Sequence, residues 1–286
     1  MLIPALVSLF IFQYLPMGGI VIAFQKFIPA KGLFGAQKWV GLANFEFIFG
    51  LQKFRELLRN TLFIATAKIV LNLIASVGAS LILNEIRQKY VKRGIQTLIY
   101  LPHFISWVIL GSIFRDILSP SAGLVNTIIA ALGGTPVYFL GDEKIFPWTV
   151  IISDIWKNFG YNTIVYLAAI SNIDPALYEA AEVDGAKRYQ RVLHITLPEL
   201  RSMIVLLTTL ALGGILNAGQ EQILTMYSPS VYSTGDIIDT YVYRMAMQDA
   251  QYSISTAVGL FKSVISMLLI VTSYWLAYKF ADYSIF

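Results

Sequence analysis

The sequence predicts an all-α integral membrane protein that crosses the bilayer with six helices. Hydrophobic residues make up 57% of its 286 residues, only 13% are charged, and the mean hydropathy is +0.66. A soluble globular chain carries roughly 25% charged residues, so this chain has too few to cover a surface that faces water. Its apolar residues also form runs of about 20, the length that a spanning helix needs.

The same composition excludes other classes of protein. Disordered chains have low hydrophobicity and high charge, which is the reverse of this sequence. The formal net charge of +4 forms no basic tail or patch, so nucleic acid is not an expected partner. Cysteine is absent, which excludes disulfides, thiolate chemistry and cysteine-based metal sites.

The first span is predicted from Met1 to Gln25, a segment without any Asp, Glu, Lys or Arg and with Pro4 in its first turn. A signal peptide is the alternative, but the segment lacks a basic start and its apolar run is longer than the usual core of such a peptide. Because no Lys or Arg stands at the start, we expect a cytosolic leader to precede Met1.

Five further spans follow along the chain. The second contains Lys68 and pairs of small residues four apart, which let helix backbones approach closely. The fifth comes directly after Leu197-Pro198, and the sixth is interrupted by Lys262. Their predicted ranges are 60–84, 93–115, 145–170, 203–218 and 256–279.

Two remaining segments are predicted to lie outside the membrane. Residues 117–141 are uncharged and are therefore a candidate seventh span, but Ser119-Pro120 and Gly133-Gly134-Thr135-Pro136 break the run. We expect a short helix there, lying across an extramembrane surface. Residues 219–255 are more polar and are predicted to form an extramembrane loop or lid.

Polar side chains inside the fourth span predict a path for a polar solute. Ionisable residues within a span are costly and usually face a bundle interior or a wet cavity. Asp154 and Lys157 are three residues apart, so an internal ion pair is the simplest interpretation, while Lys68 and Lys262 either pair with Asp154 or reach toward the membrane surface. Sugars need aromatic planes beside hydrogen-bonding groups. The candidate path residues are Asp154, Trp156, Lys157, Asn158, Tyr161, Asn162, Asn217, Gln220 and Glu221.

The loop between spans four and five carries a short helix with a marked start and stop. Asp174 is a plausible N-cap, Pro175 suits the first helical position, and Gly185 can take the left-handed conformation that ends a helix. A second short helix is expected from Lys187 to about Ile195, stopped by Leu197-Pro198. On physical grounds alone, an ordinary loop helix on the membrane surface is an equal alternative to a docking element.

This loop resembles a known family motif. Glu179-Ala180-Ala181, Asp184-Gly185-Ala186, Ile195 and Leu197-Pro198 are similar, in identity and spacing, to the EAA loop of bacterial ABC importer permeases. Val192 departs from the pattern, which has an aromatic residue there. Five further segments resemble the maltose-transporter-like carbohydrate branch of this family: Tyr14-Leu15-Pro16, Val40–Phe45, Asn60-Thr61, Tyr100-Leu101-Pro102 and Tyr166–Ile170. Two more segments, 17–25 and 101–107, resemble the complex oligosaccharide and polysaccharide subgroup of that branch.

The resemblance implies a type I ABC importer permease fold in the bacterial inner membrane, with a cytosolic EAA coupling helix. It implies three regions: an N-terminal helix and extracytoplasmic loop (1–57), the permease core (58–280) and, within it, the coupling loop (174–198). It also implies partners: a second permease, two ATPase subunits, an extracytoplasmic binding protein and membrane lipid. The implied substrate is a carbohydrate, and acidic, alginate-like polysaccharides are among the candidates. Residues implied to contact the ATPase are Glu179, Ala180, Ala181, Asp184, Gly185, Ala186, Leu197 and Pro198.

No catalytic, cofactor or metal site is expected in this chain. It has no phosphate-binding G-x-x-x-x-G-K-[ST] loop and only two histidines, so ATP and Mg²⁺ are expected on a partner subunit. The loops on the two sides of the membrane each carry nine Lys and Arg, so the positive-inside rule does not give the orientation of the chain. Only the family resemblance implies it, by placing the loop between spans four and five in the cytosol. A self-sufficient ion-coupled secondary transporter is the alternative function, and an integral membrane enzyme is a remote third.

Overall fold

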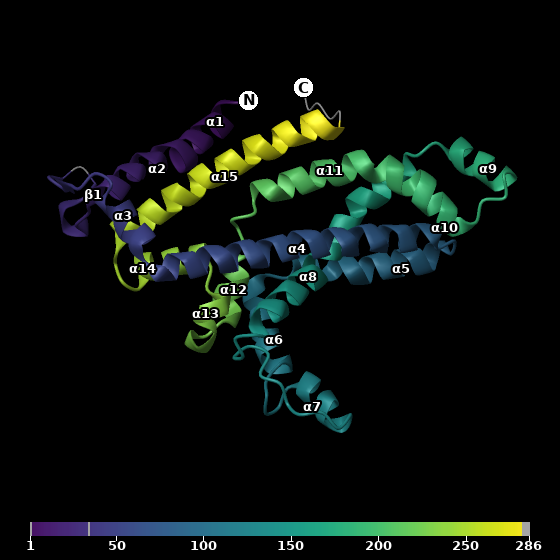
Figure 1. Cartoon of the computed structure of the whole chain (residues 1–286), viewed down its shortest axis with the longest axis horizontal. Coiled ribbons are helices and arrows are strands. Elements are labelled where there is room, and N and C mark those ends of the chain that lie inside the picture. The colour runs from purple at the N-terminus through teal and green to yellow at the C-terminus, as the bar shows by residue number, and fades with distance from the viewer. Residues whose placement is uncertain (1, 34, 282–286) are drawn as a thin grey trace.

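The computed structural model describes residues 2–33 and 35–281, so Met1, where the first predicted span starts, lies outside the described residues. The molecule is elongated and almost entirely helical (Figure 1). Its axis is the 34-residue helix α4 (Gln52–Glu85), which packs along α8 (Phe146–Ser171). Small residues make this close pairing feasible, because Ser76 and Ser80 are both buried on α4.

The first predicted span is present as a continuous run of helical turns of different widths. α1 (Ile3–Leu9) leads into a π turn η1 (Phe10–Tyr14), then α2 (Leu15–Met17) and a 3-10 segment η2 (Gly18–Phe24). The Leu15 N–H bonds to the Phe10 carbonyl, five residues back, immediately before Pro16. A wider turn at this place accommodates a proline, which has no N–H to donate.

The third predicted span is bent, which corrects the expectation of one helix over residues 93–115. α5 (Lys89–Tyr100) and the 3-10 turn η4 (Leu101–Phe104) meet α6 (Trp107–Ile117) at 102°. Ser106 is extended and its hydroxyl caps α6, so a new helix starts there. Pro102 in the preceding turn removes a backbone donor and favours the break.

The fifth predicted span starts earlier than expected, and the predicted stop at Leu197-Pro198 is wrong. α9 (Pro175–Val183) is followed by α10 (Arg188–Arg191), a second π turn η5 (Val192–Thr196) and α11 (Leu197–Gly213), which together run on from residue 188 to 213. The Leu197 N–H bonds to the Val192 carbonyl, so the chain passes Pro198 through a π turn, as it passes Pro16.

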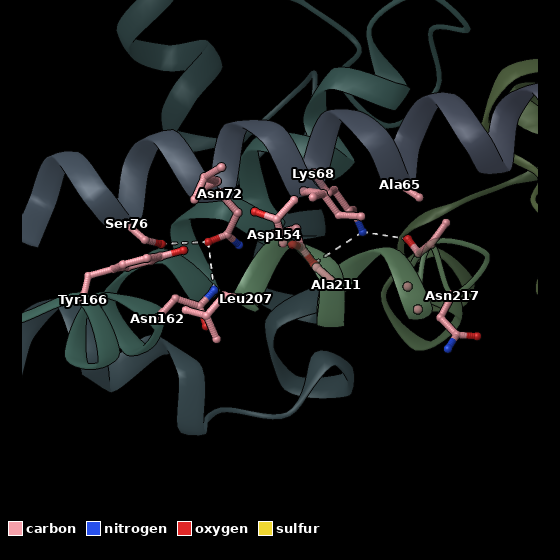
Figure 2. A pocket seen from close by; sticks show the side chains of 16 residues that line it. Ala65, Lys68, Asn72, Ser76, Asp154, Asn162, Tyr166, Leu207, Ala211 and Asn217 are labelled. Carbon is pink, nitrogen blue, oxygen red and sulfur yellow. Dashed lines mark hydrogen bonds and ion pairs between the residues drawn. The ribbon is translucent and has the colours of Figure 1, made fainter. Parts of the chain in front are cut away.

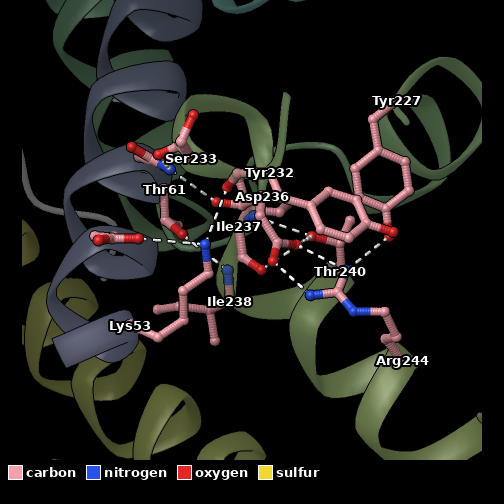
Figure 3. A network of polar contacts seen from close by, with 12 residues as sticks. Lys53, Thr61, Tyr227, Tyr232, Ser233, Asp236, Ile237, Ile238, Thr240 and Arg244 are labelled. Carbon is pink, nitrogen blue, oxygen red and sulfur yellow. Dashed lines mark hydrogen bonds and ion pairs between the residues drawn. The ribbon is translucent and has the colours of Figure 1, made fainter. Parts of the chain in front are cut away.

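Residues 219–255, predicted to form an extramembrane loop or lid, are mostly short helices packed on the bundle, which corrects the expectation of an irregular loop. They form α12 (Gln220–Met226), η6 (Pro229–Val231), α13 (Tyr232–Gly235) and α14 (Ile238–Met247). α12 packs on α6, and the turn after α13 is fixed on α4 (Figure 3). There Asn60 donates to the carbonyls of Ser233 and Asp236, at 2.9 and 3.2 Å, and the Thr61 hydroxyl accepts from the Ile238 N–H.

An ion pair completes this attachment. Asp236 is fully buried, and its carboxylate accepts from both terminal nitrogens of Arg244, at 2.6 and 3.3 Å, while the guanidinium lies 4.2 Å from the Tyr232 ring. Burial alone would lower the pKa of Arg244, but its hydrogen bonds to Asp236 and Tyr227 and its attraction to their negative charge together outweigh burial and raise this pKa. Burial also raises the pKa of Tyr227, which accepts from Arg244, to about 12.

The remaining elements lie at the periphery. α7 (Leu124–Ala131) is a short helix that projects from the bundle, so residues 117–141 form no seventh span in the structure, as expected (Figure 1). A hairpin of β1 (Gln25–Lys26) and β2 (Lys38–Trp39), joined through η3 (Pro29–Lys31), and helix α3 (Ala43–Gly50) lie at the end of the molecule opposite α9. α15 (Tyr252–Ala281) is the sixth predicted span and packs on η2 and α11.

The span count follows from these helices. Within the described residues, four are long and apolar enough to cross a membrane: 3–24, 52–85, 188–213 and 252–275; the bent pair 89–117 adds a fifth if it crosses as one span. α8, with 26 residues, is also long enough, but its polar side chains make it less apolar than those four. The buried core lies in two clusters, one around Phe146 and Ile223 and one around Leu57 and Ile238.

Candidate functional site

Helix α8 sends its two ionisable side chains in different directions. Asp154 points toward α4, where its carboxylate lies 3.4 Å from Lys68 Nζ. Lys157 points toward η4 and donates to the carbonyls of Pro102, His103 and Ile105, at 3.3, 2.8 and 2.5 Å. The predicted pair of Asp154 with Lys157 is therefore wrong, and the alternative of Asp154 with Lys68 is confirmed.

The physical reason lies in the bent third span. Where a helix breaks, carbonyls are left without intrahelical donors, and an ammonium group can satisfy several of them at once. Lys157, which is 7% exposed, donates to the carbonyls at the break after η4. Asp154 therefore pairs with Lys68 on α4 instead, a partner that the spacing along α8 alone could not identify.

A cavity of about 330 Å³ with both polar and apolar walls lies between α4, α8 and α11, at the Lys68–Asp154 pair (Figure 2). On its polar wall, Asn162 donates to Asn72 at 3.0 Å, and the Ser76 hydroxyl lies 3.1 Å from the same Asn72 oxygen. The cavity is lined by Ala65, Lys68, Ile69, Asn72, Leu73, Ser76, Asp154, Asn162, Tyr166, Leu207, Thr208, Ala211, Gly214, Asn217, Ala218 and Gly219.

Three of the nine predicted path residues line this cavity: Asp154, Asn162 and Asn217. Sequence reasoning missed Asn72 and Ser76. The signal that could have identified them is their spacing: Lys68, Asn72 and Ser76 recur every four residues, and so share one face of α4.

The other predicted residues of α8 lie elsewhere. Tyr161 stacks on His103, with ring centroids 4.0 Å apart, and Asn158 lies 3.1 Å from the same imidazole. Trp156 packs edge-on against Phe114 and is 45% exposed. These side chains, with Lys157, face the bent third span, so the structure divides the predicted cluster between two sides of α8.

The turn from α11 to α12 closes one end of the cavity. Gly219 has φ +97°, and a Cβ there would lie 2.7 Å from Lys68 Nζ, which also donates to the Ala218 carbonyl at 2.8 Å. Gln222, fully buried, accepts from Lys68 at 2.5 Å and donates to the Val150 carbonyl at 2.7 Å. Sequence reasoning missed Gln222, and selected its neighbours instead.

Those neighbours have other positions. Gln220 and Glu221 are not among the cavity's lining residues, and Glu221 is exposed. Asn217 also lines a second cavity of about 550 Å³ on α15, where Lys262 contacts it and Asp239, each at 2.5 Å. Lys262 therefore pairs with Asp239 rather than with Asp154.

The chemistry available in the main cavity is hydrogen bonding. Its polar groups are neutral amides and hydroxyls plus one cation that Asp154 compensates, which suits a solute rich in hydroxyl groups. Within the described residues, no group of three or more His, Asp or Glu side chains could hold a metal ion.

The predicted loop helix is present at the far end of the molecule. The Asp174 side chain accepts from the Ala176 N–H at 2.9 Å, Pro175 is the first residue of α9, and Gly185 has φ +76°. These features confirm the predicted start and stop of the helix. No residue of α9 is buried, so Glu179, Ala180 and Ala181 are held out from the bundle (Figure 1).

The rest of the motif lies between this helix and the next span. Asp184 and Gly185 form the turn after α9, and the Ala186 N–H bonds back to the Ala181 carbonyl at 2.8 Å. Leu197 and Pro198 belong to α11 and are thus part of a span rather than the end of a loop helix.

Residues 72–282 match the family of binding-protein-dependent transport system inner membrane components. The chain belongs to this family. It is thus a multi-pass protein of the inner membrane, the permease of an ABC transporter, which agrees with the all-helical fold and the apolar spans. The resemblance of the EAA-like loop pointed to the same family.

Two relatives from Bacillus subtilis (strain 168) resemble this permease over its whole length. Protein LplB is 43% identical over 286 residues, which cover 100% of this chain and 90% of LplB. The polygalacturonan/rhamnogalacturonan transport system permease protein YteP is 40% identical, over 100% of this chain and 89% of YteP.

Solved structures have the same fold. A bacterial ABC transporter involved in the import of the acidic polysaccharide alginate matches with a TM-score of 0.91 and 38% identity, over 98% of this chain and 94% of that one. A bacterial alginate ABC transporter in complex with an alginate pentasaccharide-bound periplasmic protein matches with the same TM-score and 37% identity, over 100% and 95% of the two chains.

Proposed function

We propose that this permease imports oligosaccharides or polysaccharides at the expense of ATP and forms the translocation path together with a second, similar permease. The observation that carries the proposal is the cavity between α4, α8 and α11, on whose polar wall Asn72, Asn162 and Ser76 offer neutral hydrogen-bonding groups. Polar groups within membrane spans are costly, so their concentration around a cavity favours a solute path.

The proposed substrates include acidic polysaccharides. The names of YteP and of the alginate transporters supply this argument, since each concerns an acidic glycan or its fragments. The cavity adds a cation, Lys68, although Asp154 lies 3.4 Å from it. An acidic sugar would compete with Asp154 for this ammonium group, whereas a neutral sugar would bind beside the intact pair.

We assign coupling to α9 and the turn that follows it. The residues proposed to contact an ATPase subunit are those of the loop motif. Support comes from exposure: α9 is held out from the bundle, and Leu177 and Val183 on it are 44% and 89% exposed. Exposed apolar side chains on an outlying helix favour a protein partner.

The chain's own residues supply no hydrolysis chemistry in this proposal. ATP and Mg²⁺ are bound by two separate ATPase subunits, and an extracytoplasmic binding protein delivers the substrate. If α9 contacts the ATPase it is cytosolic, and the β1–β2 hairpin at the opposite end of the molecule is then extracytoplasmic (Figure 1).

Gly185→Val and Glu179→Lys test this proposal in a complex reconstituted with the partner subunits. Valine at φ +76° is strained by on the order of 1 kcal/mol or more, and lysine reverses a charge on the exposed helix. Both changes should lower ATPase co-purification or substrate-stimulated hydrolysis by at least tenfold, while the two permeases still pair.

The matched control is Gly133→Val. Gly133 also has positive φ, at +83°, and open space around its Cα, but it follows α7, far from α9. If both loop variants behave like this control, α9 is not the coupling element. Sugar uptake that needs an ion gradient and no ATPase would instead establish a secondary transporter.

A further inference from the structure

The Tyr178 side chain joins the exposed helix α9 to the nearest span. Of the nine residues of α9, all but Tyr178 and Ala181 are exposed, and these two lie three apart on one face of the helix. Tyr178 Oη lies 2.9 Å from Thr196 Oγ1, within hydrogen-bonding distance. The two residues border a cavity of about 230 Å³ between α9, α10 and the end of α4.

Thr196 is well placed to receive a displacement. It is 3% exposed and is the last residue of the π turn η5, immediately before Leu197-Pro198. A π turn lacks the regular i to i−4 hydrogen bonds of the helices around it, so it deforms more easily than they do. A pull or push on the Thr196 side chain therefore acts at the π turn that separates the α-helical stretches 188–191 and 197–213 of this span.

α11 connects this turn to the main cavity. It continues without a break from Leu197 to Gly213, and its residues Leu207, Thr208 and Ala211 line the cavity that Asp154 and Asn162 also line. Thr208 lies 12 residues beyond Thr196, which in a helix is about 18 Å. A rigid helix of this length moves the cavity wall when its first turn moves.

A second contact between α9 and the same span is weaker. Arg191 and Glu182 form an ion pair at 3.1 Å, but the Glu182 side chain is 75% exposed. Ion pairs in contact with water contribute little and are screened by salt. The hydroxyl contact of Tyr178 is the less exposed of the two.

We infer that the hydrogen bond between Tyr178 and Thr196 is the contact through which movement of α9 reaches the wall of the main cavity. This makes Tyr178 a positioning residue rather than a docking residue. The inference rests on the proposed coupling role of α9 and deepens it, because it separates the face of α9 that binds the ATPase from the side chain that transmits the movement.

The test is a double-mutant cycle in the reconstituted complex, with sugar transported per ATP hydrolysed as its readout. Tyr178→Phe and Thr196→Val each remove one hydroxyl and keep the size of the side chain. Each should lower the ratio by roughly three- to tenfold, and the double variant should lower it no further than either single change. Thr196→Ser keeps the hydroxyl and should therefore keep the ratio of sugar transported to ATP hydrolysed at the wild-type value, unlike Thr196→Val.

Tyr189→Phe is the matched control, because Tyr189 lies on α10 and is 59% exposed. ATPase co-purification and basal hydrolysis should stay at wild-type levels in all these variants. A wild-type ratio in Tyr178→Phe, or a double variant equal to the product of the singles, overturns the inference and leaves the proposed function intact. Loss of the ATPase from Tyr178→Phe also overturns it, since the hydroxyl would then serve docking. If Gly185→Val and Glu179→Lys have no effect either, both the proposed function and the inference fail.

Discussion

The attachment of residues 227–244 to α4 predicts a large loss of stability in Arg244→Met. Methionine keeps much of the side-chain length but removes both nitrogens that bond to Asp236, a residue with 0% exposure. Among the described residues, the carboxylate is then left with the Thr240 hydroxyl, 2.7 Å away, as its remaining side-chain donor. A buried charge deprived of its partner destabilises a protein by about 3–5 kcal/mol.

The magnitude converts into a melting temperature. For a chain of this size, 1 kcal/mol shifts the thermal midpoint by about 2–4 °C, so Arg244→Met should melt about 6–20 °C below the wild type in detergent. Adding Asp236→Asn removes the orphaned charge and should reduce the loss to about 1–3 kcal/mol, the penalty of an imperfectly bonded polar group. The double variant is thus expected to be more stable than the single one.

Circular dichroism melts of the purified permease measure both effects. Arg55→Met is the matched control, because Arg55 is an exposed arginine on α4. If Arg244→Met has the same melting temperature as this control, the Arg244–Asp236 ion pair contributes nothing to stability. If the double variant melts below Arg244→Met, the loss comes from packing and the electrostatic reasoning is wrong.

Three further predictions concern packing, topology and the cavity. Gly160→Ala would place a Cβ 1.9 Å from the Ile99 carbonyl oxygen, so it should separate α5 from α8 and lower the melting temperature by about 5 °C or more, unlike Gly78→Ala, whose surroundings are open. Cysteine at Lys187 should react with an impermeant thiol reagent only from the cytosolic side and cysteine at Gly134 only from outside; the reverse pattern would refute the proposed orientation. Asn162→Ala should lower the rate of sugar transport by at least fivefold with basal hydrolysis unchanged, whereas equal losses in Trp156→Ala would place the path on the other side of α8.

Local signals in the sequence predicted the helices whose ends depend on local chemistry. α9 is an example, because its N-cap, its first-turn proline and its terminal glycine all act within a few residues. The predicted stop at Leu197-Pro198 failed for a complementary reason. Proline has no N–H to donate to the preceding turn, and here the wider π turn before Pro198 accommodates it, so the helix continues.

The parts that could not be predicted depend on contacts between distant segments. The packing of residues 233–238 on α4 depends on Asn60 and Thr61, more than 170 positions earlier, and no pattern within the segment indicates these partners. The partner of Asp154 likewise lies on α4. Sequence periodicity assigns residues to a face of a helix, but it does not say which neighbour that face meets.

The π turn η5 also sets the angular phase of α11. An α-helix advances about 100° per residue, so one additional residue accommodated in a wider turn shifts the phase of everything that follows by about that angle. Thr208 and Ala211 face the cavity in the shifted phase. Deleting a single residue between 192 and 196 would remove no residue of the main cavity, yet it would rotate the face of α11 that lines this cavity by about a quarter of a turn relative to α9. The spacing between the two elements is therefore as fixed as the identity of the residues in them.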